Sequence, residues 1–143
     1  MTKIETDCLS YVLEEQIGFL LRRANQRHLS IFAERIPTAT PTQFAALAQL
    51  ARMEEASQNA LGRATAMDGA TIKGVVDRLR ARGLVASRPD PEDNRRILLA
   101  LTQDGRAAVE GYIEAARQIT ADTLAPLDAG EQRQLLALLA RLG

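Results

Sequence analysis

The chain of 143 residues has one cysteine and one histidine, and its charges balance at 18 basic and 18 acidic residues. A structural zinc site or a disulfide framework needs more cysteine and histidine, so we expect no metal and no cofactor. No apolar run approaches the roughly 18 residues that span a bilayer, and the first residues lack a secretory pattern. We therefore expect a cytoplasmic protein with no membrane contact. The zero net charge gives no overall indication of nucleic-acid binding.

The composition that remains is that of an ordinary globular domain, with 46% apolar and 25% charged residues. The length fits a single domain over residues 1–143. Charge is nevertheless uneven, because residues 63–106 hold nine basic and six acidic residues, a net charge of +3, while the rest of the chain carries −3. This middle segment is either a solvated surface or a site for an anionic partner.

Apolar periodicity predicts four helices in the first half of the chain. Thr40 and Pro41 form a typical N-cap and first helical position, Asp68 is a suitable N-cap, and Gly83 suits a helix end. The expected helices cover about 11–36, a segment starting at Thr40-Pro41, about 58–65, and about 69–82.

The period changes after Gly83, where two short strand candidates flank a turn of Pro, Asp and Asn residues. Residues 84–88 and 96–101 form the expected hairpin. Thr102 then caps a long helix, Pro126 interrupts it, and a last helix starts from Asp128. The fold class is mainly α with a small β-hairpin (α+β).

This order of elements is typical of a winged helix-turn-helix, with the hairpin as the wing. The DNA-binding lobe is expected at about 40–102, between flanking helical segments at about 8–36 and 103–143. The fourth helix would lie in the major groove, where its outward residues reach base edges and phosphates. Those outward residues are Thr71, Lys73, Gly74 and Arg78.

The wing offers a second set of DNA-binding residues. Arg95 lies at its tip, where an arginine can enter a narrow A·T-rich minor groove, and Asp93 can hold the guanidinium in position. Arg88 and Arg96 flank the turn. We expect a phosphate contact from one of these two, and alternation along a strand does not say which.

The same segments resemble the MarR (multiple-antibiotic-resistance regulator) family of winged helix-turn-helix regulators. The residues that carry this resemblance are Asp77-Arg78-Leu79, Gly83-Leu84-Val85, Arg88, the run 90–95, Leu101-Thr102 and Gly105, and the start of the second helix at Thr40–Phe44 is also similar. The resemblance implies a homodimer with interlocked terminal helices that reads a pseudo-palindromic operator in double-stranded DNA. It also implies a small-molecule effector in a cleft between the dimer helices and the DNA-binding lobe.

Arg27 lies inside the apolar stripe of the first helix, with Arg23 and His28 at its margins. A charge on an apolar face needs a partner. The partner could be an acid of the second subunit, or the side chain could extend to solvent. Alternatively, Arg23, Arg27 and His28 bind an effector such as a small aromatic or organic acid, or its thioester. Apolar walls would come from Phe32, Phe44 and Met53.

We therefore expect a ligand-responsive, sequence-specific transcription regulator, most simply a repressor, and not an enzyme. Glycine spacing fits no phosphate-binding loop. One alternative is redox sensing through Cys8, although Gly18 stands where peroxide-sensing members of the family carry their cysteine. Another alternative is a helical interaction module without DNA affinity, which salt-dependent duplex binding would exclude.

Overall fold

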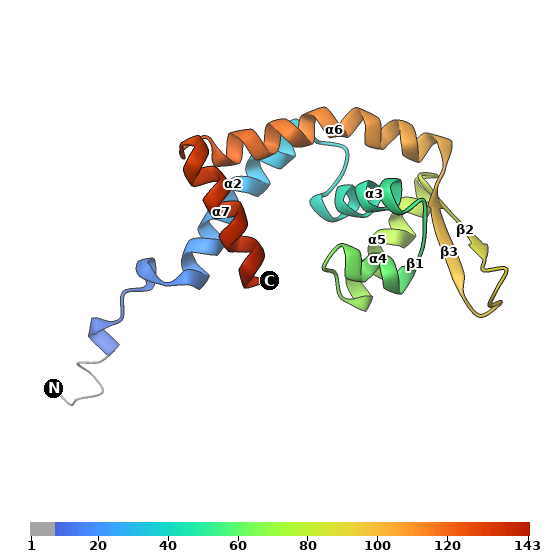
Figure 1. Ribbon diagram of the computed structural model, residues 1–143, viewed down its shortest axis with the longest axis horizontal. Coiled ribbons are helices and arrows are strands. Elements are labelled where there is room, and N and C mark those ends of the chain that lie inside the picture. The colour runs from blue at the N-terminus through green and yellow to red at the C-terminus, as the bar shows by residue number, and fades with distance from the viewer. Residues whose placement is uncertain (1–7) are drawn as a thin grey trace.

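The structure is a computed structural model that describes residues 8–143. The expectation of no secretory signal rests on the first residues of the chain. Most of these lie outside the described residues. The described chain forms an arch, in which one long helix joins a helical arm to a small α+β lobe (Figure 1). Within the described residues, no helix combines the length and apolar character needed to cross a bilayer.

The lobe contains three helices and a small antiparallel sheet. Its elements are α3 (Pro41–Met53), β1 (Glu55–Ser57), α4 (Gln58–Ala64), α5 (Gly69–Ala81), β2 (Val85–Pro89) and β3 (Ile97–Leu101). The strands pair in the order β1-β3-β2, so β3 lies in the centre. Leu47, Leu61, Ile72 and Leu79 are fully buried in the core that joins the helices to one face of the sheet. This packing fixes α5 and the β2–β3 hairpin in one body.

The arm is built from helices at the two ends of the described chain. It contains the short 3-10 helix η1 (Leu13–Glu15), α2 (Ile17–Arg35), the distal part of α6 (Gln103–Leu124) and α7 (Ala129–Leu142). A second, smaller core of Phe32, Ile36, Ala39 and Ile119 holds α2 against α6. The N-terminal part of α6 packs on the lobe and its C-terminal part packs on α2, so α6 connects the lobe to the arm (Figure 1).

The helix boundaries that the capping residues predicted are confirmed. The side chains of Thr40, Asp68, Thr102 and Asp128 each accept a backbone hydrogen bond in the first turn of the helix that follows. Gly83 has a φ of 74°, the left-handed conformation that ends a helix at little cost for glycine. Local polar signals therefore set the starts of four helices, and Gly83 sets the end of one.

Two expectations were wrong in detail. The first helix does not run continuously from residue 11, because Gln16 is extended and separates η1 from α2. Tyr11, Leu13 and Ile17 near this break are exposed, so no packing among residues 8–143 holds a longer helix together. The sheet also has a third strand, β1, which pairs with β3 through only three residues. Its Glu-Ala-Ser sequence has no strand signature of its own.

Gly105 places the first turn of α6 directly on the backbone of Leu84, the residue before β2. A Cβ at this position would overlap the carbonyl oxygen of Leu84, an atom that cannot move freely because it accepts a hydrogen bond from the Thr102 N–H. We expect Gly105→Ala to destabilise the fold by about 1–3 kcal/mol or more, the cost of overpacking a rigid site. Urea unfolding measures this change, and Gly111→Ala on the open face of the same helix is the matched control. Equal stability of the two variants would contradict the close packing.

Candidate functional site

The outward face of α5 holds the residues expected to contact DNA. Thr71, Lys73 and Arg78 are exposed, on the side of the helix opposite its buried residues. A Cβ on Gly74 would meet only the Arg78 guanidinium, at an ordinary 3.6 Å. Nothing inside the protein therefore requires glycine at this position. A small residue there leaves room for a close approach from outside.

Acidic side chains order this face. Asp68 caps α5, and the hydrogen bond from the Thr71 backbone N–H to its carboxylate, 2.7 Å long, lowers the pKa of Asp68. Lys73 Nζ donates to Asp77 Oδ2 at 2.8 Å, which lowers the pKa of Asp77. Asp77 thus bonds Lys73 rather than the adjacent Arg78, whose side chain is exposed.

The turn between β2 and β3 holds Arg95 as the sequence predicted. Asp93 Oδ1 accepts a hydrogen bond from the Arg95 backbone N–H at 3.0 Å and lies 3.5 Å from Arg95 Nε. The Arg95 side chain is 94% exposed. Backbone hydrogen bonds from Asp90 to Arg96 and from Arg96 to Asp93 close the turn. The turn is thus ordered while the guanidinium at its end is free to reach a partner.

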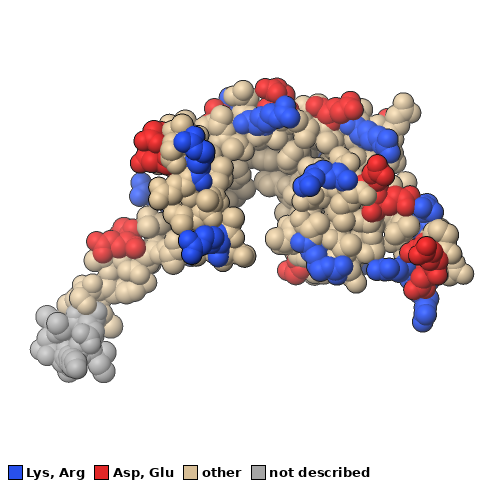
Figure 2. Space-filling model, viewed as in Figure 1, with Lys and Arg blue, Asp and Glu red and all other residues tan. Residues whose placement is uncertain are grey.

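A basic cleft of about 310 Å³ lies between this turn, α4 and α5. Arg95, Arg96 and Arg80 line it together with the polar residues that begin α4, Gln58 and Asn59. In the space-filling view, basic side chains lie over the lobe and at the end of the hairpin (Figure 2). Sequence reasoning missed Arg80, because it looked only at the outward face of α5. The excess of arginine over residues 63–106 was the available signal.

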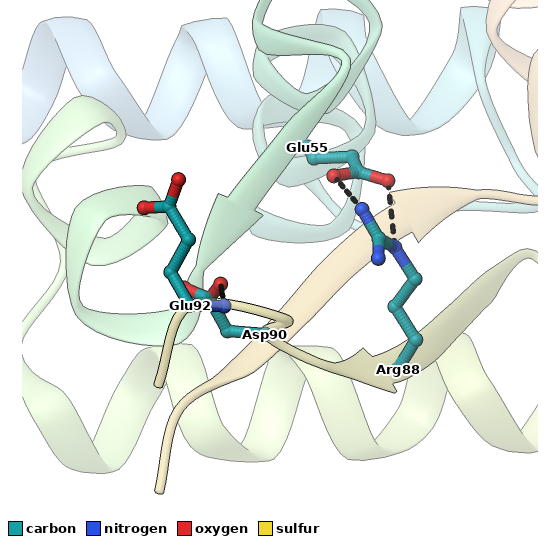
Figure 3. A network of polar contacts seen from close by, with 4 residues as sticks. All are labelled: Glu55, Arg88, Asp90 and Glu92. Carbon is teal, nitrogen blue, oxygen red and sulfur yellow. Dashed lines mark hydrogen bonds and ion pairs between the residues drawn. The ribbon is translucent and has the colours of Figure 1, made fainter. Parts of the chain in front are cut away.

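Arg88 forms a two-pronged ion pair with Glu55 across the sheet (Figure 3). Arg88 Nε and one terminal nitrogen lie 2.9 and 2.6 Å from the two Glu55 carboxylate oxygens. This bonding lowers the pKa of Glu55 and raises that of Arg88. The pair is therefore charged at neutral pH and is lost only as acid protonates Glu55. Glu55 was missed because β1 was missed.

The basic residues of α2 contact the far end of α6. Arg27 donates to the carbonyl oxygens of Asp122 and Thr123, both at 2.7 Å, and Arg35 forms an ion pair with the Asp122 carboxylate at 2.7 Å. These carbonyls lie in the last turn of α6, where helix carbonyls lack partners and a positive charge is favourable. The partner that Arg27 needed is thus a helix end in the same chain.

Two cavities flank α2, and His28 lines both. One, of about 260 Å³, lies between α2, α3 and α6 and is walled by Phe32, Phe44 and Ile119. The other, of about 320 Å³, is almost wholly apolar and lies between α2, α6 and α7. His28 Nδ1 lies 2.9 Å from Thr123 Oγ1. Arg23 and Arg27 line neither cavity. Met53, expected as a wall, packs on the core of the lobe instead.

These features define a winged helix-turn-helix protein, in which α4 and α5 form the helix-turn-helix and the β2–β3 hairpin forms the wing. The MarR family model matches residues 39–96. The transcriptional repressor NicR of Pseudomonas putida is 43% identical over 138 residues, which cover 95% of this chain and 87% of NicR. The chain belongs to the MarR family of transcription regulators, and it is a regulator rather than an enzyme.

Solved structures of relatives have the same fold. A probable transcriptional regulator from Pseudomonas aeruginosa is 53% identical with a TM-score of 0.90, covering 92% of this chain and 100% of that one. BpsR of Bordetella bronchiseptica is 43% identical with a TM-score of 0.90, covering 92% of this chain and 96% of BpsR. The BpsR structure concerns the regulation of its DNA binding by 6-hydroxynicotinic acid.

Proposed function

We propose that the protein is a homodimeric repressor that binds a pseudo-palindromic operator and releases it when a small aromatic acid binds. The observation that carries this proposal is the basic cleft, where the arginines of the wing and a residue of α5 lie together in one rigid lobe. One surface can then contact a major groove and the neighbouring minor groove at once.

The DNA contacts follow from the chemistry of each side chain. Thr71, Lys73 and Arg78 reach base edges and phosphates from α5, while Gly74 lets the helix backbone approach the DNA. On the wing, Arg95 enters the minor groove with its guanidinium held by Asp93. Either Arg88 or Arg96 adds a phosphate contact.

A second copy of the chain is the proposed partner for the arm. Large apolar side chains are exposed there, on η1, α2 and α7: Leu13, Ile17, Leu20, Leu21, Leu136, Leu138, Leu139 and Leu142. An apolar face of this extent is unusual on a monomer and typical of an interface. A two-fold dimer would place two α5 helices in successive major grooves about 10 bp apart.

The proposed effector site is centred on His28, and we propose that Arg23 and Arg27, which lie outside the cavity lining on the same helix, bind the acid group of the effector. His28 and Thr120 are polar groups beside the aromatic walls of the cavity between α2, α3 and α6. An aromatic acid fits such walls. Arg27 uses two guanidinium nitrogens on the end of α6, and its remaining N–H groups can bind a carboxylate. Binding there would change the spacing of the two lobes, and a coupling of about 1–3 kcal/mol is typical.

The alternatives raised by the sequence have less support. A module without DNA affinity is not favoured, because the chain belongs to a family of transcription regulators. Redox sensing rests on Cys8, which is exposed near the start of the described chain, ahead of η1. The relative BpsR, in which an aromatic acid regulates DNA binding, favours a ligand over an oxidant.

Titration with 6-hydroxynicotinic acid and benzoate tests the effector. We expect at least one aromatic acid to release an operator duplex, and His28→Ala and Arg27→Ala each to weaken acid binding about tenfold or more, the value of a hydrogen bond to a charged group. Calorimetry measures the affinity, and Arg22→Ala on the exposed side of α2 is the matched control. Operator release by no aromatic acid, or unchanged affinity in both variants, would contradict this site.

A further inference from the structure

The Glu55–Arg88 ion pair joins the two outer strands of the sheet across the central one. Glu55 is opposite Ala100, and Arg88 is opposite Leu98, two residues away on β3. Residues two apart on a strand face the same side, so both charged side chains lie on one face of the sheet. This face is the one opposite the core, which receives Leu99 and Leu101. The pair therefore crosses over β3 without any role in core packing.

The two ends of this ion pair are anchored very differently. β1 is a three-residue strand between the end of α3 and the start of α4, and Ser57 at its end caps α4 by accepting a hydrogen bond from the Ala60 N–H. Glu55 is therefore fixed to the helix-turn-helix. Arg88 instead stands next to last in β2, directly before the wing turn. The pair thus ties the base of the wing to the helices that precede α5.

The hydrogen bonds of Arg88 leave it poorly suited to contact a phosphate. Its Nε and one terminal nitrogen are already bonded to Glu55, and the Asp90 carboxylate adds a second negative field nearby. A phosphate would have to compete with both acids. Arg96, in contrast, forms no ion pair among the described residues and lines the basic cleft.

We infer that Glu55 and Arg88 are positioning residues that set the direction of the wing relative to α5, and that Arg96 is the phosphate contact of the two flanking arginines. This inference rests on the proposed DNA-binding function. It assigns an acidic residue a favourable role in binding a polyanion. Simple charge arguments give the opposite sign, because removing an acid near DNA ordinarily strengthens binding.

The test uses full-length protein and a duplex that the wild-type protein selects from a random-sequence pool. We expect Glu55→Gln to weaken binding about threefold to tenfold, the scale of a well-formed two-pronged ion pair. Glu92→Gln is the matched control, because it removes the same charge from the wing turn but its side chain does not bond to the pair (Figure 3). We expect this control to bind as tightly as the wild type or more tightly.

A charge exchange separates positioning from direct contact. The double variant Glu55→Arg with Arg88→Glu restores the ion pair with its ends reversed, so we expect it to bind more tightly than Arg88→Glu alone and close to the wild type. Glu55→Asp, which keeps the charge but shortens the side chain, replaces Glu55→Gln if that variant does not fold. Thermal unfolding of each variant, compared with its duplex affinity, separates lost stability from lost positioning.

Equal or tighter binding by Glu55→Gln, or no rescue in the double variant, would overturn the inference. In that case wild-type binding itself would remain, and the proposed function with it. Failure of the wild-type protein to select any duplex would instead overturn the proposed function, and the inference would fall with it.

Discussion

Leu139→Glu in α7 is expected to weaken operator binding at least about a hundredfold, although Leu139 lies in the arm and not in the DNA-binding lobe. Leu139 and Leu136 are exposed in the single chain. Together with Leu21 and Ala24 they line the apolar cavity between α2, α6 and α7. A carboxylate buried in a dimer interface at this place would cost far more than the lost leucine contacts contribute. We expect a monomer with a normal fold and at least about a hundredfold lower operator affinity. The two DNA-binding lobes are then no longer linked, so they cannot bind the two half-sites of the operator together.

Sedimentation and duplex titration of the same sample check this expectation. Ala137→Glu is the matched control, because it adds the same charge to an exposed position of α7 that points away from Leu139. We expect this control to remain dimeric and to bind normally. A Leu139→Glu protein that stays dimeric, or a monomer that keeps full operator affinity, would show that the arm does not assemble the DNA-binding form.

Arg95→Ala is expected to have the second-largest effect. The Arg95 side chain is almost wholly exposed, and its Nε lies 3.5 Å from Asp93 Oδ1 at the surface, so little within the protein depends on it. Its loss should leave stability unchanged but weaken operator binding by about 1–3 kcal/mol, or roughly fivefold to 150-fold. The slope of log K against log salt should also fall, because fewer counterions are released.

Fluorescence anisotropy at several salt concentrations measures both quantities. Arg117→Ala is a suitable control, because it removes an exposed positive charge from α6, where Arg117 forms an ion pair with Glu114 one turn away. We expect its affinity and salt slope to match the wild type. If Arg95→Ala and Arg117→Ala weaken binding equally, the wing has no specific role and only net charge matters.

Much of the fold could be predicted because its boundaries are local. Asp68 and Thr102 cap the helices that follow them, and Gly83 adopts a left-handed conformation, all within a few residues of where the sequence signal stands. β1 could not be predicted. Its three residues form a strand only because Ala56 is buried and β3 is next to it, which are contacts between distant parts of the chain.

In the candidate site, too, contacts between residues close in sequence could be predicted, and contacts between distant residues could not. The pairing of Asp93 with Arg95 is a contact between near neighbours, and the sequence predicted it correctly. The partner of Arg88 is 33 residues away, and that of Arg27 is 95 residues away at the end of another helix. A helical projection showed that Arg27 needed a partner. It could not show that the partner was a set of backbone carbonyls rather than an acid or a ligand.

The most direct test of the account is the stoichiometry of wild-type protein on a selected duplex, measured by sedimentation with and without an aromatic acid. We expect two chains on each two-fold site, binding that weakens steeply as salt rises, and release of the dimer when the acid binds. A single chain on the duplex, or no duplex binding even at low salt, would contradict the proposal that a dimer of this chain binds the operator.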